Sequence, residues 1–197
     1  MIRAMPDSHF QPAYLQQPLL ETADWLYQSS ERLAQQLNYA AQALMHTLTS
    51  GGTVLCAGED EGAHLARRAA MLLVQGQGRE RPPLAAVALT PSGSPQQPTL
   101  AQQVRALGHP GDVWLAFSLE REDPDLLAAT DAARELDMTL VAFTGEAART
   151  LGPMLRDTDV WVPLPGTRAD TMFATAWLAL SGLCAAVDNH LLGEEHP

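Results

Sequence analysis

Hydrophobic residues recur at helical spacing along residues 19–50, a stretch that contains neither proline nor glycine. Leucines such as Leu33 and Leu37 stand four positions apart, as one face of an amphipathic helix requires. Gly51 and Gly52 then end the pattern. The pattern predicts one long helix or two in succession. Packing against a second copy of the chain and covering the domain's own core both remain open for this segment.

Short apolar runs alternate with helical segments after residue 52. The expected strands are 53–57, 84–89, 112–117, 139–144 and 159–163. Helices are expected at 63–75, 99–107, 123–137, 147–156 and 167–192. Asp123-Pro124 is a helix start signal, and Thr167 with Asp170 has the spacing of a capping box. Continuous apolar strands between helices predict an α/β fold, with a five-stranded parallel sheet covered on both faces.

The domain organisation follows from these elements. Residues 1–18 carry three prolines among polar residues and are expected to form an irregular tail. Residues 19–50 form an N-terminal helical extension, residues 51–192 the α/β domain, and residues 193–197 a short tail. Ligands of such sheets bind at the carboxyl ends of the strands. The loops to consider are therefore 58–62, 90–98, 118–123 and 145–146.

Composition and charge exclude several classes of function. The 197 residues are 46% hydrophobic, so the chain is not disordered, and the formal net charge is −11. All 12 basic residues are arginine, which excludes a lysine Schiff base and a P-loop lysine. The acidic balance argues against direct binding of nucleic acid or of an anionic membrane. No secretion signal or membrane span is indicated, so a cytoplasmic location is expected.

Other candidate chemistry is weak. Cys56 and Cys184 cannot form a disulfide framework, and Cys56 is expected to be a small buried hydrophobe. The six histidines lack metal-binding spacings, and no catalytic triad can be argued, so no metal, cofactor or catalytic residue is expected. Four arginines form the only local basic cluster, which is interpreted as a solvated face. They are Arg67, Arg68, Arg79 and Arg81.

Five stretches resemble the SIS (sugar isomerase) domain family over roughly residues 20–192. They are GGTVLCAG (51–58), RERPPLAAVAL (79–89), QVRALGHPGDVWLAFS (103–118), DMTLVAFTG (137–145) and LCAAVDNHLL (183–192). The chain is most similar to the single-domain branch, the phosphoheptose isomerases and the DnaA initiator-associating proteins. The third and last stretches resemble the latter more. The resemblance implies a flavodoxin-like sandwich that forms dimers or tetramers through N-terminal helices.

The resemblance also implies a sugar-phosphate site in the loops after the first and third strands, whose usual forms are G-N-G-x-S and S-T-S-G-N-S. This chain keeps Gly58 and Ser118 but departs from the pattern elsewhere. Its first loop continues as Glu59, Asp60, Glu61 and Gly62, and its second as Leu119, Glu120, Arg121, Glu122 and Asp123.

Carboxylates are poor replacements in a phosphate loop, which works through small residues and exposed N–H groups. Two like charges ~4 Å apart repel by about 4 kcal/mol at a protein-surface dielectric. Three interpretations of the acids stay open: structural or solvated residues, a surface for a basic partner, or a cation site. Each of them makes an ordinary sugar-phosphate site improbable. These loop residues are thus a degenerate ligand site.

The catalytic residues implied by the isomerase resemblance are also missing. The histidine and glutamate of the isomerase's H-F-A-E-E element are replaced by Arg68 and Leu72. The glutamine and histidine of its last helix are replaced by Phe173 and Ser181. Proton transfer between sugar carbons needs a positioned acid–base pair, which these four residues do not provide.

The sequence therefore favours a non-catalytic SIS-domain protein, a homo-oligomer that binds a protein partner. By resemblance, the partner would be the replication initiator DnaA. Leu191 and Leu192, beside an acidic C-terminus, are candidate partner contacts if they are exposed, and packing residues otherwise. The alternatives are a phosphoheptose-isomerase-like enzyme and a sensor that binds a sugar phosphate without chemistry.

Overall fold

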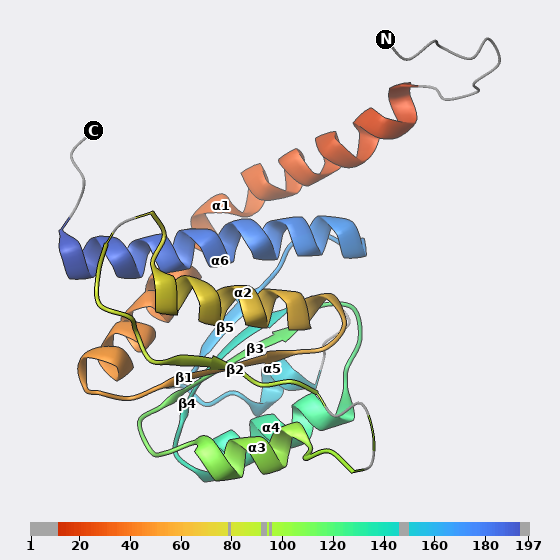
Figure 1. Ribbon diagram of the computed structural model, residues 1–197. Coiled ribbons are helices and arrows are strands. Elements are labelled where there is room, and N and C mark those ends of the chain that lie inside the picture. The colour runs from red at the N-terminus through yellow and green to blue at the C-terminus, as the bar shows by residue number, and fades with distance from the viewer. Residues whose placement is uncertain (1–11, 79, 92–93, 95, 146–149, 194–197) are drawn as a thin grey trace, which may run out of the picture.

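The computed structural model describes residues 12–78, 80–91, 94, 96–145 and 150–193. Its five strands form one parallel sheet in the order β2-β1-β3-β4-β5 (Figure 1). They are β1 (Val54–Gly58), β2 (Ala86–Ala88), β3 (Val113–Ser118), β4 (Thr139–Thr144) and β5 (Val160–Pro163). Each of the expected strands is present, within two residues of the expected bounds. The α/β sandwich predicted from the sequence is confirmed.

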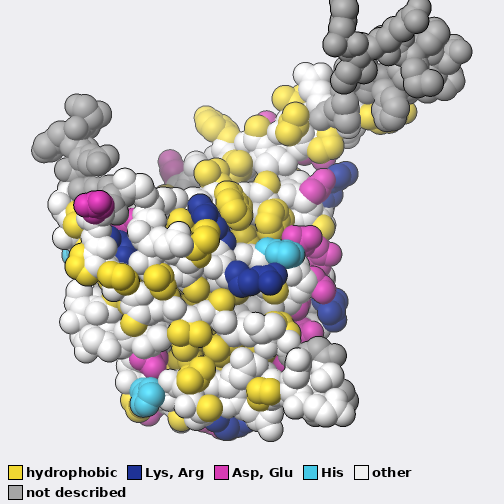
Figure 2. Space-filling model, in the orientation of Figure 1, with side chains coloured by type: hydrophobic (Ala, Val, Ile, Leu, Met, Phe, Trp, Pro, Cys, Tyr) yellow, Lys and Arg dark blue, Asp and Glu magenta, His cyan; other side chains and the backbone are white. Residues whose placement is uncertain are grey.

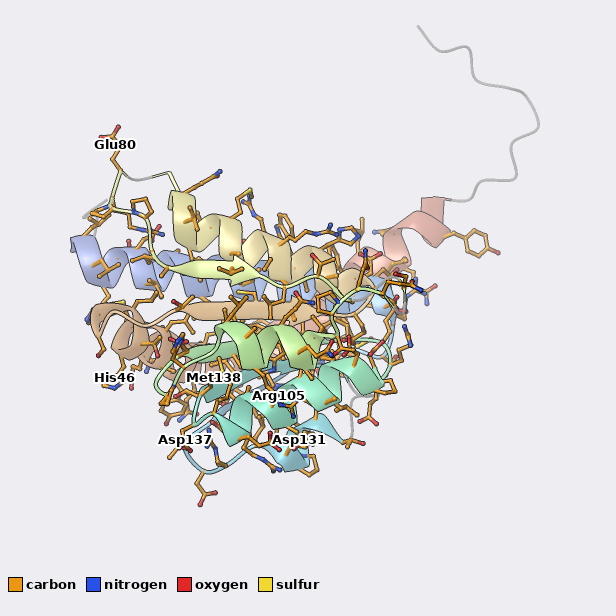
Figure 3. All side chains as sticks on the ribbon, turned by 60° about the horizontal axis from the view of Figure 1, so that its bottom comes forward. His46, Glu80, Arg105, Asp131, Asp137 and Met138 are labelled. Atoms are coloured by element: carbon orange, nitrogen blue, oxygen red, sulfur yellow. The ribbon has the colours of Figure 1, made fainter. Side chains whose placement is uncertain are left out.

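Six helices cover the two faces of the sheet within the part of the chain that the structure describes. They are α1 (Pro12–Thr49), α2 (Glu61–Gln75), α3 (Leu100–Leu107), α4 (Pro124–Glu135), α5 (Leu151–Met154) and α6 (Ala169–Leu192). Helices α1, α2 and α6 pack on one face, while α3, α4 and α5 pack on the other (Figures 1 and 3). Near Arg105 and Asp131, α3 and α4 lie side by side.

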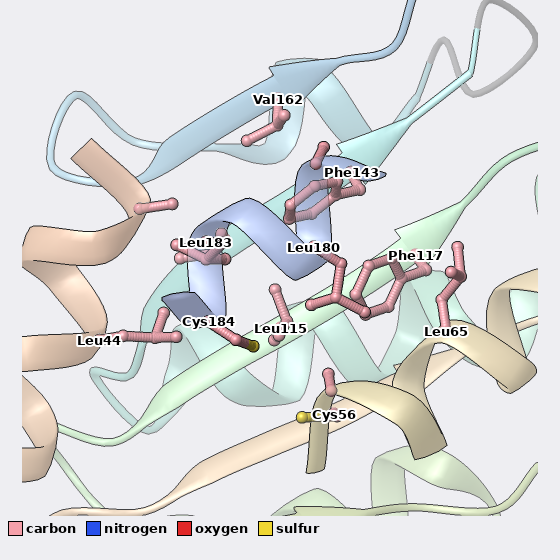
Figure 4. Packing of buried hydrophobic residues seen from close by; sticks show 14 of the residues in the cluster. Leu44, Cys56, Leu65, Leu115, Phe117, Phe143, Val162, Leu180, Leu183 and Cys184 are labelled. Atoms are coloured by element: carbon pink, nitrogen blue, oxygen red, sulfur yellow. The ribbon is translucent and has the colours of Figure 1, made fainter. Parts of the chain in front are cut away.

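The alternation of side chains along the strands explains the two layers. In β3, Leu115 and Phe117 point into the core beneath α2 and α6, while Trp114 and Ala116 point into the core beneath α3 and α4. Figure 4 shows Phe117 beside Phe143, whose ring centroids are 5.0 Å apart. Both faces of the central strands are buried, which accounts for their continuous apolar sequences.

The N-terminal helix is longer than the sequence pattern indicated. Helix α1 is a single helix that begins at Pro12 and includes Pro18. The prediction of an irregular tail over residues 1–18 is therefore wrong for residues 12–18, and residues 1–11 lie outside the described part. Proline at the first helical position needs no hydrogen-bond donor, so Pro12 is compatible with a helix start. The first half of α1 extends beyond the rest of the fold (Figure 1).

The cap predictions had different outcomes. Asp123 caps α4, because its side chain accepts hydrogen bonds from the N–H groups of Asp125 and Leu126. The capping box expected at Thr167 and Asp170 is wrong. Helix α6 begins after Arg168, which makes no side-chain cap, and the Asp170 carboxylate pairs with the Arg168 guanidinium instead. The helix expected at 147–156 is reduced to α5, and residues 147–149 lie outside the described part.

Arg81 does not belong to a solvated basic face, so that part of the sequence prediction is wrong. Its side chain is 1% exposed and that of its partner Asp188 is 3% exposed, with 2.6 Å between Nε and Oδ1. The Arg81 guanidinium also donates to the carbonyls of Leu72 and Leu73 at the end of α2. The second Asp188 oxygen accepts from the Gln77 N–H. This network joins the ends of α2 and α6 to the loop between α2 and β2.

Helix α6 is the one helix within the described residues that is long and apolar enough to cross a membrane. Half of its most apolar window is buried within the fold, as expected of a core helix. Cys184 of α6 and Cys56 of β1 are both buried free thiols, and burial raises the pKa of each. Cys56 is thus a buried hydrophobe, as expected.

Candidate functional site

The two loops singled out from the sequence lie at one edge of the sheet. Strands β1 and β3 are parallel neighbours, and Gly58 pairs with Phe117. The loop after β1 and the loop after β3 therefore begin side by side. A Cβ atom on Gly62 would collide with the Phe117 carbonyl oxygen, so the chains approach more closely here than any other residue would permit. The expectation that the two loops form a common site is consistent with this geometry.

Glu59 occupies the space between the loops. Its side chain is 5% exposed, and its Oε1 atom accepts a hydrogen bond of 3.1 Å from the Leu119 N–H. Oε2 is buried and has no hydrogen-bond partner among the described residues. The pKa of Glu59 is raised to about 7, mainly by burial and to a smaller extent by the charge of Asp123, although hydrogen bonding with the Glu59 and Leu119 N–H groups and with Ser118 opposes the rise. The one hydrogen bond that reaches the carboxyl from the loop after β3 is that of the Leu119 N–H, among the described residues.

An ion pair closes the outside of the site. The Arg121 guanidinium is 2.8 Å from the Asp60 carboxylate of the first loop and 3.7 Å from Asp123. The hydrogen bond and charge of Asp60 raise the pKa of Arg121 above its ordinary value. The side chains of Arg121 and Asp60 are more than half exposed, so the pair bridges the loops at the surface and adds little stability.

The remaining loop acids are separate from Glu59. Glu122 accepts hydrogen bonds from the N–H and hydroxyl of Thr150. Glu61 is exposed in the first turn of α2, and Glu120 is exposed in its loop. The Ser118 hydroxyl donates to the Arg121 carbonyl, as a serine at a strand end often satisfies nearby backbone. These contacts agree with the structural interpretation of the acids, and a ligand role for the loop residues stays a prediction.

Asp60 stands in a backbone conformation that favours glycine, with φ of 44° and ψ of −115°. The family pattern described above has glycine at this position. The first loop thus keeps a glycine-like shape although its residue has changed. A conformation of this kind costs of order 1–3 kcal/mol for a residue with a Cβ atom.

Asp60→Gly is expected to raise the free energy of unfolding by about 1 kcal/mol, because relief of this strain outweighs the added entropy of the unfolded chain. Urea unfolding of both proteins measures the difference. Asp60→Ala is the matched control, since it removes the ion pair with Arg121 but retains the strain. Equal stability of the two variants would contradict the explanation.

The α2–α6 face holds the positions that the isomerase resemblance assigns to catalysis. The Arg68 guanidinium lies 5.2 Å from the ring centroid of Trp177, and its buried Nε has no hydrogen-bond partner among the described residues. Phe173 packs beside Trp177, with 6.3 Å between ring centroids, and Leu72 is buried. A cation–π contact and apolar packing thus replace ionisable side chains.

Sequence reasoning did not single out Leu119 or Thr150, whose donors bind the loop acids. Leu119 could have been noticed as an apolar residue inside a charged loop. Leu191 and Leu192 are 37% and 38% exposed, so they are not buried packing residues. They lie nineteen or more residues along α6 from Met172, which is near Leu119, and are thus roughly 30 Å from the loops. Among the described residues, no cluster of His, Cys, Asp and Glu could hold a metal ion.

A parallel five-stranded sheet with helices on both faces and two adjacent loops after β1 and β3 defines a three-layer α/β sandwich protein. The SIS domain family model matches residues 19–145, more than half of the chain. The chain therefore belongs to the SIS domain family.

Two groups of relatives are similar over most of the chain. The phosphoheptose isomerase of Methylibium petroleiphilum is 37% identical over 190 residues, covering 92% of this chain and 95% of that protein. The DnaA initiator-associating protein DiaA of Salmonella paratyphi B is 33% identical over 172 residues, covering 83% and 88%. These identities do not separate the two branches, and the sequence's leaning toward the second rests on the quoted motifs.

Solved structures of phosphoheptose isomerases share the fold. That from Neisseria gonorrhoeae has a TM-score of 0.79 and 26% identity, covering 90% of this chain and 98% of its own. That from Francisella tularensis has a TM-score of 0.81 and 25% identity, covering 89% and 97%. The flavodoxin-like sandwich expected from the resemblance is confirmed.

Proposed function

We propose that this chain is a non-catalytic SIS-domain protein, a cytoplasmic homo-oligomer that regulates a protein partner. The observation that carries the proposal is the position of Glu59. Its carboxyl occupies the space between the loops after β1 and β3 and uses the Leu119 N–H that an incoming anion would need. A phosphate there would meet a buried carboxyl and the nearby Asp123, which disfavours it electrostatically.

The α2–α6 face supports the absence of isomerisation. Arg68, Leu72, Phe173 and Ser181 stand where the isomerase resemblance places its catalytic groups. None of the four is a usable general base, and the Arg68 guanidinium lies over Trp177.

Exposed apolar residues support self-association. Helix α1 exposes large hydrophobic side chains along its first half, and hydrophobic side chains also gather over the helical face in Figure 2. Those in the first half of α1 are Tyr14, Leu19, Leu20, Trp25 and Tyr27. Such side chains favour burial against another helix. We propose that the N-terminal helices join two or four copies of the chain.

The kinship with the DnaA initiator-associating protein makes DnaA the proposed partner, with regulation of replication initiation as the role. A protein that binds nucleic acid carries a basic surface, and this chain has a net charge of −11. The half-exposed Leu191 and Leu192 at the end of α6 are proposed contacts. The 37% identity to a phosphoheptose isomerase keeps an isomerase-like enzyme or sugar-phosphate sensor as the alternative.

Purified protein is expected to retain DnaA of the same organism in a pull-down at low salt, and the retention is expected to weaken as salt rises. Replacing Leu191 and Leu192 with serine is expected to reduce retention at least tenfold. Leu107→Ser, which replaces an exposed leucine at the end of α3, is the matched control and is expected to retain DnaA normally.

Calorimetric titration with sedoheptulose 7-phosphate separates the alternatives. We expect no heat of binding and no turnover. Absence of association with DnaA would remove the proposed partner. Binding of the sugar phosphate would favour the sensor, and turnover would favour the enzyme.

A further inference from the structure

The Glu59 carboxyl is the structural link between the interiors of the two loops. It comes from the loop after β1, yet its Oε1 accepts from Leu119 N–H in the loop after β3. Leu119 is itself buried, and its carbonyl oxygen lies against Gly145 after β4. Withdrawal of Glu59 would leave the Leu119 N–H without its partner. A movement of this one side chain is therefore tied to the position of the loop after β3.

The surroundings of Glu59 favour the neutral carboxyl over the charged carboxylate. A charged carboxylate would have a buried Oε2 without a hydrogen-bond partner, which is costly in a dry interior. Asp123 repels that charge, while Arg121, already engaged by Asp60 and Asp123, attracts it. The neutral carboxyl avoids both the repulsion and most of the cost of burial. The titratable and charged groups of the two loops and the first turn of α2 are Asp60, Glu61, His64, Glu120, Arg121, Glu122 and Asp123.

We propose that Glu59 is a proton-controlled latch, which holds the loops after β1 and β3 together while it is neutral and releases them more often once it is ionised. The inference rests on the proposed function, since it takes the space between the loops to be filled by Glu59 and not by a ligand. The latch regulates that same site. Opening moves the carboxylate into water and exposes the Leu119 N–H.

The size of the expected pH effect follows from the linkage between protonation of Glu59 and opening of the loops. If Glu59 regains its ordinary pKa of 4.5 in the open state, opening is favoured by at most tenfold per pH unit, up to the closed-state value of about 7. Between pH 5 and pH 7, opening is then expected to become roughly 40-fold more frequent, because Glu59 is already partly ionised in the open state at pH 5 and half ionised in the closed state at pH 7. Above pH 7, both states are ionised and the dependence levels off.

Amide hydrogen exchange of the unliganded, full-length protein tests the latch, with each rate corrected for its intrinsic pH dependence. The protection factor of the Leu119 amide is expected to fall roughly five- to sevenfold per pH unit between pH 5 and pH 7 and to level off above pH 7. In Glu59→Gln, which keeps the shape and an acceptor, the protection is expected to be independent of pH. Glu120→Gln removes an exposed acid beside Leu119 in the loop after β3 and is expected to behave as the wild type does.

The amide of Leu115 inside β3 reports on unfolding of the whole sheet and is expected to exchange more slowly than that of Leu119. Equal protection of the two amides at every pH would show that the loops open only with the entire fold and would overturn the latch. An unchanged pH dependence in Glu59→Gln would overturn it as well. Both results are independent of DnaA and sugar phosphates, so the latch and the proposed function can fail separately.

Discussion

Replacing Arg81 with methionine is expected to lower the free energy of unfolding by about 3–5 kcal/mol, because the Asp188 carboxylate would then be buried without its counter-charge. The carbonyls of Leu72 and Leu73 would also lose the guanidinium that they accept from. Urea unfolding at a fixed protein concentration measures the loss, since self-association contributes to the apparent stability. A loss below about 1 kcal/mol would contradict a buried, ionised pair.

The double variant Arg81→Met with Asp188→Asn is the control for this prediction. It removes both charges, and the asparagine oxygen can still accept from the Gln77 N–H. At least half of the lost stability is expected to return, because neutral groups do not carry the desolvation cost of an unpaired charge. A double-mutant cycle with Asp188→Asn alone isolates the interaction between the two side chains. If the losses of stability in the two single variants are additive, Arg81 stabilises the fold through its contacts with α2 and not through Asp188.

The order of strands and helices was predictable because each strand is a continuous apolar run buried on both faces. The run 139–144 coincides with β4, and the start signal at Asp123 was correct, since a cap depends on residues adjacent in sequence. The start of α1 was harder to predict from the sequence. Prolines suggested an irregular tail, but Pro12 is tolerated in the first turn, and Pro18 is accommodated inside a helix whose later residues pack on α6.

Side-chain pairing at long range was the part that sequence could not supply. Arg81 belongs to an apparent basic cluster in the sequence, and its partner Asp188 lies 107 residues further along the chain. Asp60 pairs with Arg121, 61 residues away. The type of a charged residue does not reveal whether its side chain is solvated or buried in an ion pair. That outcome depends on which residues the fold places beside it.

The site illustrates the same distinction within three consecutive residues. Glu59, Asp60 and Glu61 are alike as a run of acids, and the sequence predicted a common effect on phosphate binding. In the structure, Glu59 is buried between the loops, Asp60 pairs with Arg121, and Glu61 is exposed at the start of α2. The electrostatic argument against a phosphate therefore depends mainly on Glu59, which is the acid nearest the Leu119 N–H.

Glu59→Gln is expected to be more stable than the wild type at pH 8 by about 3 kcal/mol and equally stable near pH 4.5. The folded protein holds the Glu59 proton with a pKa of about 7, against 4.5 for an ordinary glutamate. Because the pKa is raised on folding, the stabilisation by Glu59 is fully present below pH 4.5. It is lost as pH rises toward 7 and changes no further above that value. Glutamine does not ionise and is free of this loss.

The difference in unfolding free energy between Glu59→Gln and the wild type, from urea titrations at pH 5, 6, 7 and 8, measures this effect. Taking the difference cancels the titration of the other acids, whose contributions are common to both proteins. Glu120→Gln is the matched control and is expected to give a constant difference, since Glu120 is exposed. A constant difference for Glu59→Gln would mean that Glu59 is ionised at no cost inside the fold. The donors around the carboxyl would then satisfy its charge, and the space between the loops would suit a bound anion.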